Sequence, residues 1–96
     1  MPAATRIGDV CSGHGCYGPR HSIGGSTNVF INGIGATRAT DLWETHCCGP
    51  VCHDGAVESG QASTKVFING LPAVRIGDLL NCGSASAQGS PSVFFG

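Results

Sequence analysis

The stretch THCCGPVCHDG, residues 45–55, contains two of the four histidines and three of the six cysteines of the chain. Imidazole and thiolate groups bind transition metals, and paired thiols form disulfides. Covalent haem attachment needs C-x-x-C-H, but three residues separate Cys48 from Cys52. Zinc knuckles need C-x-x-C pairs, and the chain has none. A metal site, a disulfide and a redox role for the adjacent Cys47 and Cys48 therefore stay open.

The composition limits the surroundings of these residues. The chain has 96 residues, 16 of them glycine, and only 11% are charged. This predicts a small domain of short strands and many turns. The formal net charge of −1 offers no basic surface for nucleic acid or anionic lipid.

The sequence shows neither an apolar run of membrane-spanning length nor a signal-peptide layout, so synthesis in the cytoplasm is expected. In a reducing compartment, six cysteines favour metal ligands or buried thiols over a disulfide framework. A disulfide between loops, formed after release into an oxidising space, remains an alternative.

An internal repeat predicts the architecture. Residues 26–41 read STNVFINGIGATRATD and residues 63–78 read STKVFINGLPAVRIGD. Each copy predicts a β-hairpin with an Asn-Gly type I′ turn. The expected strands are residues 29–31 and 34–38 in the first copy, and 66–68 and 71–75 in the second.

The two ends of the chain contain a third copy in two pieces. Residues 6–9 read RIGD, as in the second repeat, and residues 93–95 read VFF, similar to VFI. Together they predict a closed, mainly β, pseudo-threefold domain over residues 1–96, with the termini close together. The recurring Arg-x-x-Asp pairs are expected to hold the loop bases by local ion pairs: Arg6 and Asp9, Arg38 and Asp41, Arg75 and Asp78.

Three predicted loops, residues 10–28, 42–65 and 79–92, contain every histidine and cysteine. His14 and His46 each lie five residues after a repeated aspartate, and Cys82 lies four after the third. A threefold arrangement would bring these side chains together, with Cys52 or His53 from the longest loop as the fourth ligand. A mixed His/Cys tetrahedral set favours one structural zinc ion over iron.

The other notable residues of these loops are expected to have surface or packing roles. His21 is expected at the surface, Cys16 and Tyr17 are expected to pack along the first loop, and Trp43 to anchor the long one. The cysteines of the long loop that do not bind metal are expected to pack.

The residues PAVRIGD (72–78), the two VFING strands and GSPSVF (89–94) resemble the PAAR-repeat family. The resemblance implies a small cone that caps a trimeric β-helical spike, one tip per trimer. Such spikes belong to type VI secretion systems (the VgrG protein) or contractile phage tails. A zinc ion near the apex is implied, held by His14, His46, His53 and Cys82. Cys52 or Cys47 is the alternative to His53.

The implied function is mechanical: the tip focuses the force of contraction and pierces a membrane, without catalysis. Phe30, Phe67 and Phe94 are expected to face the core or the docking base. No fused toxin domain is expected, and the assembled tip would be delivered outward. The alternatives are a small zinc-binding interaction module and a thiol-redox protein, while an enzyme is disfavoured because so small a chain leaves little room for a substrate cleft.

Overall fold

Two of the predicted hairpins are present in the computed structural model, which describes all of residues 1–96. Strand β1 (Phe30–Ile31) pairs with β2 (Ile34–Gly35), and β5 (Phe67–Ile68) pairs with β6 (Leu71–Pro72). Both turn residues have positive φ angles, 55° and 78° in the first turn and 54° and 79° in the second. The predicted Asn-Gly turns are therefore confirmed.

The return strands are shorter than the predicted 34–38 and 71–75. Ala36 and Ala73 still donate their N–H groups to Val29 and Val66 of their own hairpins (3.1 and 3.0 Å), and the chain then bonds to the neighbouring repeats. Thr37 donates its N–H to the carbonyl of Thr5 (3.0 Å), Thr5 to Val74 (3.0 Å), and Val74 to Thr37 (3.1 Å). All three residues are fully buried. The three repeats are thus joined in a closed cycle of backbone hydrogen bonds.

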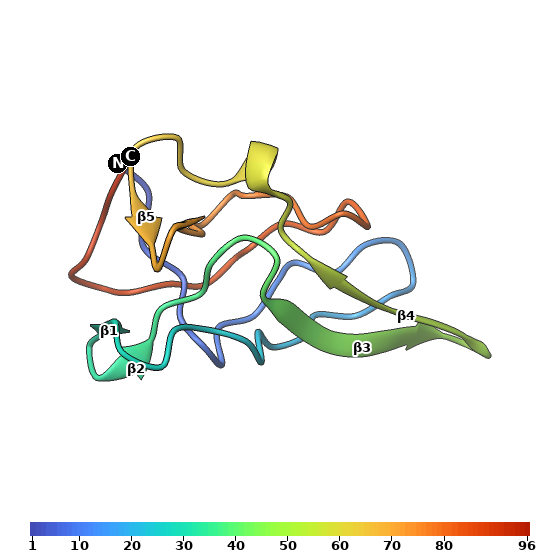
Figure 1. Cartoon of the computed structure of the whole chain (residues 1–96). Helices are drawn as coiled ribbons and strands as arrows, with labels where there is room; N and C mark the ends of the chain where they lie inside the picture. The colour runs from blue at the N-terminus through green and yellow to red at the C-terminus, as the bar shows by residue number, and fades with distance from the viewer.

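The two ends of the chain associate as predicted. Ala4 donates its N–H to the carbonyl of Val93 (3.0 Å), and Phe95 donates to Pro2 (3.1 Å). Figure 1 shows the N- and C-termini side by side. The split third unit is therefore assembled from both ends, while an exact threefold relation of the repeats stays a prediction.

Each repeat also contains its predicted ion pair. In the repeat 26–41, Asp41 Oδ2 accepts the backbone N–H and the Nε–H of Arg38 at 2.8 and 2.9 Å, and Oδ1 accepts the N–H of Nη2 at 2.9 Å. Arg6 with Asp9, and Arg75 with Asp78, make the same three bonds. These bidentate pairs fix the point where each hairpin passes into its connecting loop.

The prediction that residues 42–65 form a loop was wrong in one respect, because this segment contains the longest hairpin of the protein. Strand β3 (Leu42–Cys48) pairs with β4 (Val51–Ala56), followed by the short 3-10 helix η1 (Ser59–Gln61). Gly49, with φ 61°, and Pro50 form the two-residue connection, and a II′ turn takes glycine at this position.

The molecule is elongated, measuring 37 × 25 × 21 Å. The β3–β4 hairpin projects at one end, whereas β1, β2, β5 and both termini lie at the other (Figure 1). No helix is long and apolar enough to cross a membrane.

The core is small and divided. Trp43, 1% exposed, anchors one cluster as predicted, and a second cluster lies beneath the β1–β2 and β5–β6 hairpins. The first consists of Cys11, Ala39, Trp43, Val57, Ala62, Val74 and Leu80, and the second of Ala4, Ile31, Ala36, Ile68 and Ala73. Only 9 of the 43 backbone hydrogen bonds lie within regular strands. The fold therefore depends strongly on hydrogen bonds and other contacts between its loops.

Candidate metal centre

The register of the β3–β4 hairpin places two histidines face to face. His46 on β3 pairs with His53 on β4, and their Nε2 atoms are 3.2 Å apart. Since alternate residues of a strand point to the same side, the adjacent pair, Cys47 and Cys52, points the other way. The hairpin therefore presents two imidazoles on one face and two sulfurs on the other.

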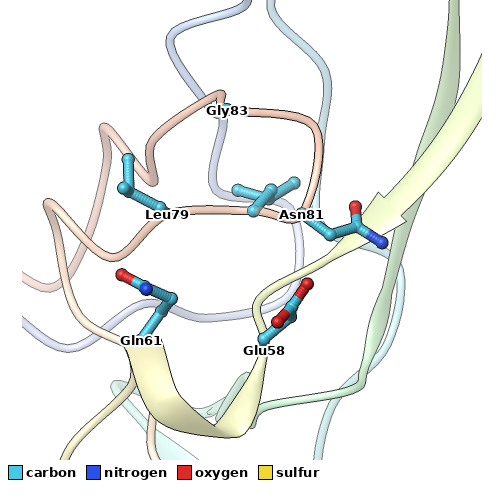
Figure 2. A pocket seen from close by; sticks show the side chains of 6 residues that line it. Glu58, Gln61, Leu79, Asn81 and Gly83 are labelled. Carbon is cyan, nitrogen blue, oxygen red and sulfur yellow. The ribbon is translucent and has the colours of Figure 1, made fainter.

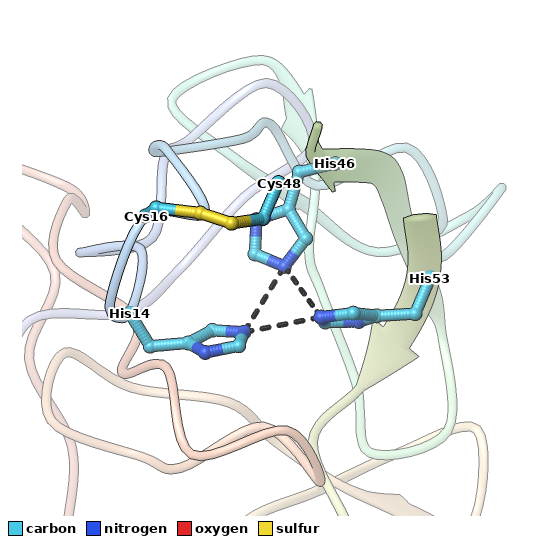
Figure 3. Close-up of a disulfide and its surroundings, with 5 residues drawn as sticks. All are labelled: His14, Cys16, His46, Cys48 and His53. Atoms are coloured by element: carbon cyan, nitrogen blue, oxygen red, sulfur yellow. Dashed lines mark hydrogen bonds between the residues drawn. A yellow bond between two sulfur atoms is a disulfide. The ribbon is translucent and has the colours of Figure 1, made fainter. Parts of the chain in front are cut away.

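The first loop supplies a third imidazole. A tight turn positions it: His14 and Tyr17 exchange backbone hydrogen bonds of 2.9 and 2.8 Å. His14 Nε2 lies 3.2 Å from the Nε2 atoms of both His46 and His53. Figure 3 shows the three nitrogens converging on one point.

Hydrogen bonds at the far side of two rings define their tautomers. His46 Nδ1 lies 2.8 Å from the carbonyl oxygen of Gly18, and His53 Nδ1 lies 2.9 Å from that of Asp54. A carbonyl only accepts, so each Nδ1 carries a proton, and in the neutral form of such a ring the lone pair is on Nε2. Two lone pairs 3.2 Å apart repel each other unless a cation lies between them. The donor arrangement thus fits a bound metal ion.

The electrostatics of His14 favour the same state. Desolvation, followed by Coulomb interactions with His46, His53 and Arg20, lowers the pKa of His14. A lower pKa keeps the imidazole neutral, which is the form that binds metals.

Cys82, from the loop 79–92, completes the group. The ligand atoms of His14, His46, His53 and Cys82 all lie within 4.8 Å of one another. In a tetrahedral zinc site, bond lengths of about 2.05 Å to nitrogen and 2.3 Å to sulfur give separations of about 3.3 Å between nitrogens and 3.6 Å between nitrogen and sulfur. The three nitrogens match this spacing, and the Cys82 sulfur is the fourth donor atom of the group.

The structure brings together the four side chains assigned by the resemblance, whereas the alternatives to His53, Cys47 and Cys52, lie outside this group. Cys47 and Cys52 form a disulfide, with Cα atoms 4.1 Å apart, so neither sulfur is free to bind metal. Cys16 and Cys48 form a second disulfide, with Cα atoms 5.4 Å apart, which joins the first loop to β3 (Figure 3). The expectation that the remaining cysteines pack as thiols was wrong for these four, and only Cys11 is a fully buried free thiol.

Two residues around the centre were not assigned to it from the sequence. The Tyr17 ring stacks on His14 with centroids 4.7 Å apart and lies within 4.9 Å of the His46 and His53 centroids. Arg20 donates to Cys82 Sγ at 3.0 Å. The spacing of Tyr17, three residues after His14 in a Gly-rich turn, is the one local signal of such a contact.

His21 lies at the surface, as expected. Its ring contacts the Glu44 carboxylate at 2.8 Å, with both side chains about half exposed. Hydrogen bonds from the His21 backbone and side chain lower the pKa of Glu44. This pair lies outside the group of four candidate ligands.

A cavity of about 230 Å³ lies beside the end of β4 and η1. Figure 2 shows its lining, which includes Glu58, Gln61 and Asn81 and contains no histidine or cysteine. It is therefore distinct from the candidate metal centre and supplies no thiol or imidazole nucleophile.

No curated protein sequence matches the chain. The family profile of the PAAR motif, however, matches residues 12–88, which include all four candidate ligands and all three hairpins. A match over most of the sequence establishes the family: the chain belongs to the PAAR-motif family.

Proposed function

We propose that this protein is the tip of a trimeric β-helical spike, either a VgrG-like spike of a type VI secretion system or a phage tail spike. The family supports this role, and one structural observation carries it. Phe30, Phe67 and Phe94 occupy equivalent positions in the three repeats, and are 58%, 58% and 48% exposed. Burying an aromatic side chain in an interface is a major source of binding energy.

These phenylalanines belong to the end of the molecule that holds β1, β5 and the C-terminus, opposite the β3–β4 hairpin (Figure 1). A monomer with three similar repeat units, the β1–β2 and β5–β6 hairpins and the unit formed by the two chain ends, can present one of them to each subunit of a trimer. We therefore assign this end as the docking base, with one tip bound per trimer. The opposite end is the leading point, which contacts the target membrane transiently.

The candidate metal centre lies toward the leading point, because His46 and His53 belong to the projecting hairpin. We propose one structural zinc ion bound by His14, His46, His53 and Cys82. The bound ion would cross-link the first loop, the hairpin and the loop 79–92. Such a cross-link would stiffen the point where two connecting loops meet the hairpin.

The function is mechanical in this proposal, and no bond of a substrate is made or broken. The protein is made in the cytoplasm, docks on the spike before contraction, and is carried outward with it. In this proposal the metal stiffens the leading point, and the three phenylalanines bind the base of the protein to the spike.

Co-purification with a trimeric spike protein tests the docking base. The variants Phe30→Glu, Phe67→Glu and Phe94→Glu should each lose spike binding while keeping the thermal transition of the parent. Val51→Glu is the matched control, because Val51 is 59% exposed and lies on β4 in the projecting hairpin. Equal loss with Val51→Glu, or no loss with the three phenylalanine variants, contradicts the proposed docking base.

Metal analysis of protein purified without added metal tests the other end. We expect one zinc per chain, and loss of zinc from His46→Ala, His53→Ala and Cys82→Ala. His21→Ala, which removes a surface histidine paired with Glu44, should retain zinc. A wild-type protein without stoichiometric metal contradicts the metal centre.

A further inference from the structure

We propose that Arg20 is a positioning residue of the metal centre, which holds the Cys82 sulfur and the β3–β4 hairpin in place around the ion. The proposal rests on the metal centre described under the proposed function. Arg20 is only 2% exposed. The other three arginines pair with the aspartates of their repeats, but Arg20 makes no ion pair. Burying a guanidinium costs free energy unless hydrogen-bond partners replace its water. The groups that accept hydrogen bonds from Arg20 therefore indicate what the side chain does in the fold.

Those partners lie on the segments that carry the ligands. Arg20 Nη2 donates to Cys82 Sγ at 3.0 Å, and Nη1 donates to the carbonyls of Glu44 (3.1 Å) and His53 (3.3 Å). Glu44 precedes His46 by two residues on β3, and Arg20 belongs to the loop that holds His14. One side chain thus connects all the segments that contribute to the candidate centre.

The bond to Cys82 is suited to a metal-bound sulfur. A cysteine that binds metal does so as a thiolate, and a guanidinium N–H donates a charge-assisted hydrogen bond to it. Such partners orient the ligand and withdraw electron density from it. Arginine fits this position better than lysine, because its planar fork reaches the sulfur and two carbonyls at once.

The strand beneath the guanidinium leaves room for it. Gly55 on β4 has no side chain, and a Cβ there would collide with Arg20 Nη2 and lie 3.2 Å from Cζ. The backbone of Gly55 does not need a left-handed conformation. The absence of a side chain at Gly55 therefore leaves the space that the Arg20 guanidinium occupies.

Substitution of cobalt(II) for zinc gives a spectroscopic test in the whole chain. In Arg20→Met, loss of the hydrogen bond raises the energy of the sulfur electrons, so the sulfur-to-cobalt charge-transfer band should move to longer wavelength. Cobalt affinity should fall by about 10–100-fold, the range for loss of a group that orients a ligand. Arg20→Lys should restore part of both properties. Lys65→Met, which removes an exposed cation, should leave them unchanged.

The outcomes separate the two proposals. A wild-type protein that binds no cobalt overturns the metal centre and Arg20 together. A wild type with a tetrahedral cobalt spectrum, and an Arg20→Met protein with the same band and affinity, overturns Arg20 alone. Gly55→Ala serves if Arg20→Met does not fold, because it displaces the guanidinium from Cys82 without removing the charge. The same band shift is expected, and an unchanged band overturns the proposal.

Discussion

Cys47 and Cys52 lie opposite each other on β3 and β4, and their disulfide closes the hairpin immediately beside the pair His46 and His53. The strand period of two separates the roles of these neighbours, since imidazoles occupy one face and the disulfide the other. A one-residue change of register would exchange the two faces. The disulfide thus fixes the register on which the histidine pair depends.

The second disulfide, Cys16–Cys48, is expected to contribute more to stability than Cys47–Cys52. It closes a separation of 32 residues rather than 5, and the chain-entropy relation gives about 4 kcal/mol for the former and 2 kcal/mol for the latter. Urea unfolding of Cys16→Ser/Cys48→Ser and Cys47→Ser/Cys52→Ser measures the difference.

Thiol titration of the unfolded protein provides the control. Two thiols, Cys11 and Cys82, should react before reduction, and all six cysteines should react after it. Six reactive thiols in protein that was never exposed to reductant would contradict both disulfides.

The carboxylate of Asp41 is expected to be a large local contribution to stability. It accepts three hydrogen bonds from Arg38, and its side chain is 11% exposed. Asp41→Ala leaves these donors unpaired and should lower the free energy of unfolding by about 2 kcal/mol, since hydrogen bonds to charged groups are stronger than neutral ones.

Chemical denaturation of Asp41→Ala beside Asp54→Ala measures this effect. Asp54 is an exposed carboxylate without an ion pair, so its removal should change stability by less than about 0.5 kcal/mol. Equal effects of the two substitutions would show that the Arg38 pair contributes nothing.

The repeated segments were predictable because each carries its own turn and strand signals. Asn32-Gly33 and Asn69-Gly70 determine the hairpins locally, and the two pieces of the third repeat revealed that the ends meet. The four candidate ligands came from the family resemblance, since register alone left Cys52 and His53 as alternatives.

The long loop was harder to interpret because its strands are poor in β-branched residues. Only Thr45 and Val51 are β-branched between Leu42 and Ala56. The hairpin is held by contacts from elsewhere, including the bond from Glu44 N–H to the His21 carbonyl (2.9 Å). The disulfide pairing and the three-way contact of Arg20 depend on tertiary structure, which no local pattern specifies.

The metal-free protein is expected to become less stable in mild acid. An unfolded histidine has a pKa of about 6.5, and the folded protein lowers the pKa of His14. Below about pH 6.5 the unfolded chain therefore binds a proton that folded His14 does not yet accept. The stability from His14 is complete above this pH and is lost as the pH falls through the folded pKa.

Thermal unfolding between pH 8 and pH 5, with chelator present, measures this dependence. His14→Gln should show a smaller decrease in Tm than the parent. An identical pH profile would contradict the depressed pKa of His14. In the metal-loaded protein, acid should also release the ion, because protons compete for its ligands.

The turn that holds His14 is expected to depend on Gly13. Gly13 has φ 72°, and a Cβ there would lie 2.6 Å from the Tyr17 carbonyl oxygen and 2.8 Å from the Gly18 carbonyl carbon. Gly13→Ala must therefore displace the backbone that carries both His14 and the Gly18 carbonyl bound to His46. Zinc content should fall well below one per chain.

Gly15→Ala is the matched control, because Gly15 also has positive φ, 55°, but open space at Cβ. It should cost about 1 kcal/mol of stability through backbone strain and retain its zinc. If Gly13→Ala keeps full zinc occupancy, the turn does not position His14 for the metal.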